Sequence, residues 1–158
     1  MRTPIRAGIL LGVLVAAWTF VMGFSGWYKD PVLLNLFFLV IPLEIGIVIW
    51  ALRATAGDAG YGRQVANGLV LSLVASAIVF CGSLLFTTVV FPHYFEELQA
   101  IQAQMLKTQG LSEADIKTQV EAAAAMQTPL MNAFSGVIGT VVTGVAVAAI
   151  AGAFWRRK

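Results

Sequence analysis

The sequence predicts an all-α integral membrane protein, a four-helix bundle with both termini in the cytoplasm and an extracytoplasmic helical hairpin between the third and fourth helices. Three observations predict it: the composition, four long apolar segments, and the distribution of basic residues. Hydrophobic residues make up 59% of the 158 residues and charged residues 11%, and the mean hydropathy is +0.84. Soluble domains carry about 25% charged residues, and so short a chain cannot bury this much apolar surface in its own core.

Four segments have the roughly 20 mostly apolar residues that a membrane helix needs. They define a single membrane domain, residues 1–158, with spans at about 5–27, 33–52, 65–91 and 130–155. Two basic residues precede the first span, as in a signal peptide. That apolar run is longer than the roughly 7–15 residues of a signal core, and no A-x-A-like site follows it, so we favour a membrane span.

Lysine and arginine collect on the cytoplasmic side of membrane proteins, so their positions predict the orientation. With the N-terminus inside, seven lie on the inner side and three on the outer side: Arg2, Arg6, Arg53, Arg63, Arg156, Arg157 and Lys158 against Lys29, Lys107 and Lys117. Among the loop acids, only Asp58 is on the inner side. Four spans return the chain to its starting side, so both termini agree with this orientation.

The long polar connection before the fourth span predicts a helical hairpin over about 94–127. Its apolar residues recur at helical spacing, Gly110 fits a helix stop, and Ser112 with Asp115 forms a variant of the capping box. Only Pro92 interrupts the chain between the third span and this hairpin. We therefore expect the third and fourth helices to extend beyond the membrane as a paired stalk.

Glu44 is the sharpest candidate for a functional residue. It lies near the middle of the second span, where an ionisable group is expensive and usually functional, and Pro42 nearby removes a backbone donor and can kink the helix. Four polar residues share its depth on other helices: Thr19, Ser76, Thr140 and Thr143. Glu44 is either a proton or cation site, or a neutral acid that hydrogen-bonds a neighbouring helix or the backbone freed by Pro42.

Small residues recur every fourth position in the fourth span, at Gly136, Thr140, Gly144, Ala148 and Gly152. Such faces let membrane helices approach closely, either inside the bundle or between copies of the chain. His93 and Glu97 have the spacing of two metal ligands, but a metal site needs more ligands than two. Cys81 is expected to be a small packing residue. We predict no metal, no cofactor and no catalytic residue.

The layout resembles a family of bacterial membrane proteins called domain of unknown function 4199. The resemblance rests on three features: the segment Tyr61-Gly62-Arg63-Gln64 followed by Gly68-Leu69, the hairpin from Tyr94-Phe95 to Gly110-Leu111-Ser112-Glu113-Ala114-Asp115-Ile116, and the glycine-rich fourth span. It implies a four-helix protein of the bacterial inner membrane and carries over no catalytic residues.

Two functions fit these observations. The first is a non-enzymatic, structural or accessory protein whose hairpin or small-residue faces contact a second copy of itself or another membrane protein. The second is a small transporter or channel subunit that uses Glu44. In either case the lipid bilayer surrounds the helices, and no long basic run indicates nucleic acid.

Overall fold

The computed structural model describes residues 2–57 and 59–155, and every regular element in these ranges is a helix. The all-α prediction is therefore confirmed. The α-helices are α1 (Arg2–Phe24), α2 (Val40–Ala54), α3 (Tyr61–Leu85), α4 (Tyr94–Thr108), α5 (Glu113–Met126) and α6 (Pro129–Phe154). Three short elements complete the fold: the 3₁₀ helices η1 (Trp27–Lys29) and η2 (Leu33–Leu39), and the π-helix η3 (Phe86–Val90).

Four helical stretches are long and apolar enough to cross a membrane: Arg2–Phe24, Leu33–Ala54, Tyr61–Val90 and Pro129–Phe154. The first ends before the predicted residue 27, because Gly26 has a φ of 70° and turns the chain into η1. Glycine is the residue that adopts this left-handed conformation without strain. Proline at the first position of α6, with the Thr128 hydroxyl accepting from the Met131 amide, marks the start of the last stretch.

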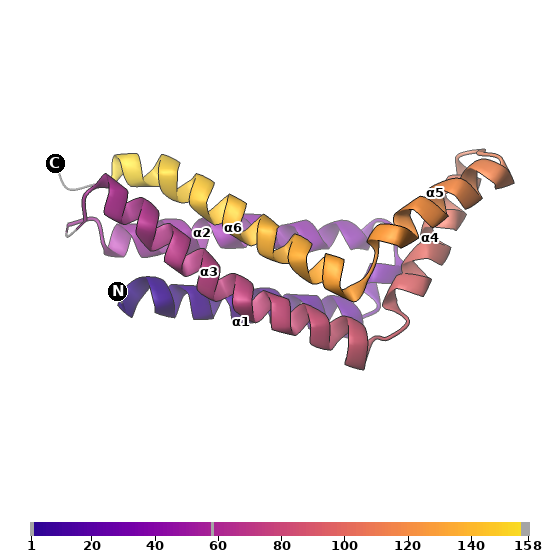
Figure 1. Ribbon diagram of the computed structural model, residues 1–158, viewed down its shortest axis with the longest axis horizontal. Coiled ribbons are helices and arrows are strands. Elements are labelled where there is room, and N and C mark those ends of the chain that lie inside the picture. Colours follow the sequence, from indigo (N-terminus) through magenta and orange to yellow (C-terminus); the bar gives the residue numbers. More distant parts are fainter. Residues whose placement is uncertain (1, 58, 156–158) are drawn as a thin grey trace.

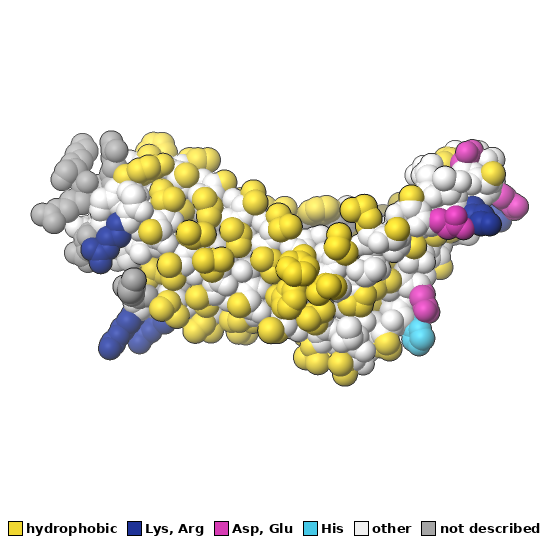
Figure 2. Space-filling view, viewed as in Figure 1, with side chains coloured by type: hydrophobic (Ala, Val, Ile, Leu, Met, Phe, Trp, Pro, Cys, Tyr) yellow, Lys and Arg dark blue, Asp and Glu magenta, His cyan; other side chains and the backbone are white. Residues whose placement is uncertain are grey.

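Charged side chains gather at the two ends of the molecule, and apolar side chains cover the length between them (Figure 2). Arg53 and Arg63 lie at the end that holds the N-terminus, whereas α4 and α5 carry acids at the other end (Figure 1). This pattern is compatible with helices crossing a bilayer. Four residues used to predict the orientation, Asp58, Arg156, Arg157 and Lys158, lie outside the described residues.

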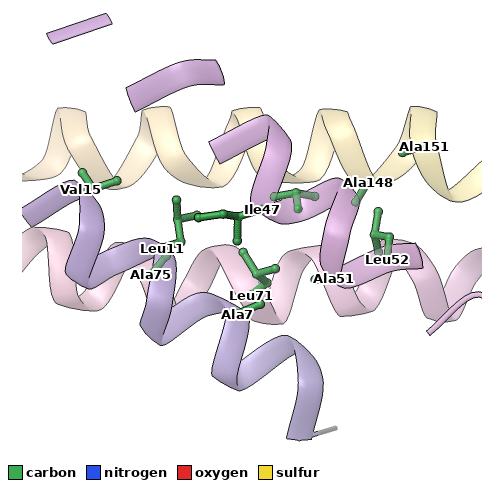
Figure 3. Packing of buried hydrophobic residues seen from close by; sticks show 11 residues of the cluster. Ala7, Leu11, Val15, Ile47, Ala51, Leu52, Leu71, Ala75, Ala148 and Ala151 are labelled. Carbon is green, nitrogen blue, oxygen red and sulfur yellow. The ribbon is translucent and has the colours of Figure 1, made fainter. Parts of the chain in front are cut away.

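The third helix is the centre of the bundle, since α3 packs along both α1 and α6, while α2 packs against α1 and α6. Side chains from all four long helices meet in one apolar core, including Leu11 of α1, Ile47 of α2, Leu71 of α3 and Ala148 of α6 (Figure 3). Small residues allow this close approach, as membrane helices require. A Cβ on Gly12, for example, would lie 2.8 Å from the Cβ of Ile78.

The predicted continuous stalk is wrong, because the chain breaks between α3 and α4. After the π-helix η3, Phe91 adopts a φ of −129°, and α4 starts at Tyr94 in a new direction (Figure 1). Pro92 supplies no amide hydrogen and disfavours helical backbone at the residue before it. The end of α3 and the start of α4 therefore cannot form one helix.

Helices α4 and α5 lie side by side and extend beyond the bundle (Figure 1). The expected local signals occur between them: Gly110 has a φ of 81°, and the Ser112 hydroxyl accepts a hydrogen bond from the Asp115 amide at 3.2 Å. These signals turn the chain and start α5. Which side of a membrane the pair occupies remains a prediction.

At the opposite end, Gln64 ties three helices together. Its fully buried amide donates to the backbone carbonyls of Leu52 at 3.2 Å and Trp155 at 2.9 Å, and the Thr55 hydroxyl donates to its side-chain oxygen at 2.9 Å. The last carbonyls of a helix have no partner within that helix. Gln64 therefore caps the C-terminal ends of α2 and α6 from α3, which closes this end of the bundle.

Candidate functional site

Pro42 lies in the first turn of α2 rather than in the middle of a long α-helix. The preceding turns form the 3₁₀ helix η2, and α2 begins only at Val40. The first amides of an α-helix have no carbonyl partner within the helix, so a proline there disrupts little. Pro42 is exposed and contributes no group to the interior. Glu44 follows Pro42 by two residues, about half a helical turn, and its side chain faces the interior of the bundle.

The Glu44 side chain is buried, with 3% of its surface exposed, and its Oε1 atom has no hydrogen-bond partner among the described residues. Oε1 lies next to α6, at 3.4 Å from the position that a Cβ on Gly144 would take. The same Cβ would collide with the Ser72 hydroxyl. Gly144 thus leaves room for both polar groups, and Ser72 donates its own hydrogen to the Gly68 carbonyl at 3.0 Å.

Glu44 lines a cavity of about 510 Å³ between α1, α2, α3 and α6. Its polar lining residues are Thr19, Glu44, Ser83, Tyr94, Asn132, Ser135, Thr140 and Thr143. Aromatic rings of Phe37, Phe38, Phe86 and Tyr94 and aliphatic side chains form the remaining walls. On α6 the lining runs from Asn132 to Thr143, a distance of about 16 Å at 1.5 Å per residue.

The cavity is open on one side of the bundle. Phe38, Ser135 and Gly139 line it and are exposed at the molecular surface. Because Phe38 belongs to η2 and the other two belong to α6, the opening lies between these elements. Toward the end that holds Gln64, the core around Leu71 and Ala148 is closely packed. The cavity therefore reaches the middle of the bundle from the end where α4 starts.

Three of the four residues predicted to share the depth of Glu44 line this cavity: Thr19, Thr140 and Thr143. The fourth, Ser76, is not among the lining residues, and its hydroxyl donates to the Leu73 carbonyl of its own helix at 3.0 Å. A shared depth in the membrane does not place two residues on facing helix surfaces, which explains this difference.

The small-residue face of α6 packs against α3 within the chain. Thr140, Gly144, Ala148 and Gly152 are buried, and Gly136 is half-buried. A Cβ on Gly68 would collide with Ala148, a Cβ on Gly152 would lie 3.1 Å from the Cβ of Gln64, and one on Gly136 would lie 3.3 Å from Val79. The structure places this face inside the bundle.

Two other sequence candidates occupy the surface. His93 pairs with Glu96 at 2.9 Å, with both side chains exposed, and residues 2–57 and 59–155 contain no group of three or more potential metal ligands. Cys81 is exposed on α3, so its expected role in internal packing is wrong. An apolar run does not show which positions face the core, because the lipid-facing side of a membrane helix is equally apolar.

The aromatic walls, Ser83 and Asn132 were not predicted from the sequence. Asn132 donates to the Ser83 hydroxyl at 3.0 Å and so links α6 to α3 at the cavity. Because both are polar residues near the ends of apolar segments, the sequence contained a signal from which this contact between helices could have been predicted. No sequence signal distinguishes Phe37 and Phe86 from lipid-facing phenylalanines, because both environments are apolar.

An aromatic cluster connects the cavity to α4. Tyr28, Phe86 and Tyr94 are buried together, and the Tyr28 hydroxyl donates to the carboxylate of Glu97, which also pairs with Lys29 at 3.1 Å. Burial raises the pKa of Tyr94 to about 12, so this cavity-lining phenol is neutral at physiological pH. The pKa of Glu97 lies below its usual value of 4.5, mainly because of the hydrogen bond from Tyr28 and to a lesser extent because of the contact with Lys29.

We expect Glu97→Gln to reduce stability at neutral pH by about 1 kcal/mol, because the Tyr28 hydroxyl loses a charged acceptor that is itself partly exposed. A carboxyl group with a lowered pKa stabilises the fold above its unfolded pKa and loses this effect as the pH falls through its folded pKa. The difference between wild type and Glu97→Gln should therefore be present at pH 7 and vanish well below pH 4.5.

Thermal unfolding in detergent measures this difference in stability. Glu96→Gln, which alters only the exposed pair with His93, is the control. A difference that does not shrink as the pH falls below 4.5 would contradict the prediction.

The described residues thus form an all-helical chain with four stretches able to span a membrane and one interior acid beside a cavity, which is compatible with a polytopic membrane protein. The chain belongs to the family described as Protein of unknown function (DUF4199), which matches residues 6–157, nearly its whole length. The resemblance drawn from the sequence is confirmed. No curated protein and no solved structure gives a significant match.

Proposed function

We propose that this protein is a small transporter or channel subunit that uses Glu44 as its binding group. One observation carries the proposal: the Oε1 atom of Glu44 is buried without a hydrogen-bond partner among the described residues, and the side chain lines a cavity of about 510 Å³. Ligand cavities in proteins are typically about 300–1,000 Å³.

The alternative role for Glu44, a neutral acid hydrogen-bonded for structure, has less support. Neither a neighbouring helix nor the backbone near Pro42 provides a partner for Oε1 within the described residues. An unsatisfied buried polar group destabilises a fold by about 1–3 kcal/mol. Such a group is retained when it serves a ligand or ion, and intramembrane acids commonly mark transport pathways.

Flux through reconstituted protein tests the proposal. The full chain is placed in liposomes that contain a pH-sensitive dye, and a potassium diffusion potential drives protons across the bilayer. We expect proton flux above that of protein-free liposomes, and at least a tenfold reduction in Glu44→Gln. Glu121→Gln, the same substitution at an exposed position of α5, should behave as wild type. Equal flux in Glu44→Gln and wild type would reject the proposal, as would no flux in either.

A structural or accessory role is the second candidate. It is favoured by α4 and α5, which extend beyond the bundle and offer a surface to a second copy or another membrane protein (Figure 1). Affinity purification in a mild detergent tests it, and recovery of monomer alone would argue against it.

We place the protein in the bacterial inner membrane with both termini in the cytoplasm. The basic residues Arg53 and Arg63 at one end and the acidic α4–α5 pair at the other support this orientation (Figure 2). A cysteine introduced at Gly110 should then react with a membrane-impermeant maleimide in whole cells from which the outer membrane has been removed. Protection of this cysteine until the cells are lysed would reverse the orientation.

A further inference from the structure

We propose that the ligand of the Glu44 cavity is a lipophilic organic cation with a single positive charge, bound with its charged group at Glu44 and its apolar body among the aromatic rings. This inference rests on the proposed function, since it names the class of ligand for the same cavity.

The charge of the lining favours a cation. Glu44 is its one acidic residue, Tyr94 is the other titratable group, and no lysine, arginine or histidine is among the lining residues. An anionic ligand would find no positive partner and would face a carboxyl group. A positively charged group at the inner end of the cavity would lie against the Glu44 side chain, which carries the one carboxyl group of the lining.

The aromatic rings favour an organic cation over a neutral hydrogen-bond donor. Phe37, Phe38, Phe86 and Tyr94 contribute to the walls of the same cavity. The faces of aromatic rings attract cations, and quaternary ammonium groups are commonly bound by such rings. A neutral ligand could satisfy Glu44 but would gain nothing from this attraction.

The dimensions of the cavity also favour a molecule over a single inorganic ion. The space of about 510 Å³ extends for about 16 Å along α6, and most of its surface is apolar. A divalent metal ion requires several oxygen, nitrogen or sulfur ligands, whereas Glu44 is the only carboxylate here. A bulky apolar molecule with a single positive charge matches this distribution of groups.

The opening indicates how such a ligand enters. It lies between α6 on one side and η2 with the first turn of α2 on the other, where Phe38 of η2 is 65% exposed and Ile41 of α2 is 45% exposed. On α6, the exposed residues Ser135 and Gly139 form the other side of the opening. A ligand that partitions into the bilayer reaches the cavity across this apolar rim and meets Glu44 only at the inner end.

Binding to the purified full chain in dodecylmaltoside tests the inference, with two ions of the same shape and opposite charge as probes. Equilibrium dialysis should show saturable binding of tetraphenylphosphonium and no Glu44-dependent binding of tetraphenylborate. Benzyltriethylammonium serves as a smaller cation. We expect Glu44→Gln to weaken binding of at least one cation tenfold or more, whereas Glu121→Gln should bind it as wild type does.

A second variant blocks the cavity and leaves the acid in place. Gly139 lines the cavity, and a Cβ added there would have no atom within 4 Å, so a side chain can start from this position without displacing the backbone. Gly139→Leu should elute as wild type in size-exclusion chromatography and bind the same cation at least tenfold more weakly. Weaker cation binding by Gly139→Leu would show that the ligand occupies the cavity, because an attraction of the cation to the charge of Glu44 from outside the cavity would be unchanged in this variant.

The inference is overturned if neither cation binds, if Glu44→Gln and Gly139→Leu bind like wild type, or if tetraphenylborate shows the same dependence on Glu44. These results are separable from the flux experiment. Cation binding without proton flux supports the ligand class and removes the transport role. Glu44-dependent proton flux without cation binding supports transport and removes the ligand class.

Discussion

Gly68→Leu is expected to destabilise the bundle by about 3 kcal/mol, the upper end of the range for an overpacked core. A Cβ on Gly68 would overlap the Cβ of Ala148, and the Gly144 carbonyl and the Ala148 Cα lie 3.5 and 3.6 Å away. These are a methyl group and backbone atoms, so no change of rotamer relieves the clash. Helices α3 and α6 must move apart, and the contacts along their shared face are lost.

Unfolding by dodecyl sulfate in dodecylmaltoside micelles measures this effect through the loss of helical circular dichroism. Gly46→Leu is the matched control, because a Cβ on this exposed residue of α2 has no atom within 4 Å. The control should be as stable as wild type or more so, since leucine favours helix over glycine by up to about 1 kcal/mol. If the two variants unfold at the same detergent composition, the close α3–α6 contact does not contribute to stability.

The same contacts bear on the two roles that the sequence left open for the small-residue face of α6. In one chain, Gly144, Ala148 and Gly152 already meet Ser72, Gly68 and Gln64 of α3, so this face is occupied. A second copy of the chain would have to use other surfaces. An accessory role would therefore have to use α4 and α5, or the exposed apolar faces of the bundle, rather than the small-residue face.

The helices and their ends were predictable because their signals are local. Gly110 and Ser112 turn and cap the chain through their own backbone and side chains, and Pro92 acts on the residue next to it. The largest error here, a continuous stalk, came from treating Pro92 as a weak interruption. In the structure a π-helix precedes it, and the helix direction changes.

The cavity was less predictable because it depends on how the helices are rotated. Glu44 was identifiable as the single acid within an apolar span, and three of the residues that share its depth, Thr19, Thr140 and Thr143, line the same cavity. Depth alone also selected Ser76, which does not line the cavity. In a membrane protein both faces of a helix are apolar, so hydrophobic periodicity gives little information about rotation.

Glu44→Met is expected to stabilise the protein by about 1–3 kcal/mol, while abolishing cation binding. Methionine is close in size to glutamate and has no group that requires a hydrogen bond. The wild-type residue is 3% exposed, and its Oε1 has no partner within the described residues. Burying a polar group without a hydrogen bond destabilises a fold by about 1–3 kcal/mol, so an apolar side chain of similar size at the same position should restore about this much stability.

The direction of this change separates the two roles of Glu44 more clearly than loss of activity does. If the acid holds α2 to α6 by hydrogen bonds, Glu44→Met must be less stable than wild type, and Glu44→Gln should preserve most of the stability. If the acid serves a ligand, Glu44→Met should be the more stable of these two variants, because glutamine still buries a polar group. Resistance to unfolding by dodecyl sulfate ranks the three proteins. A gain in stability together with a loss of binding is the pattern of a site retained for function at the expense of the fold.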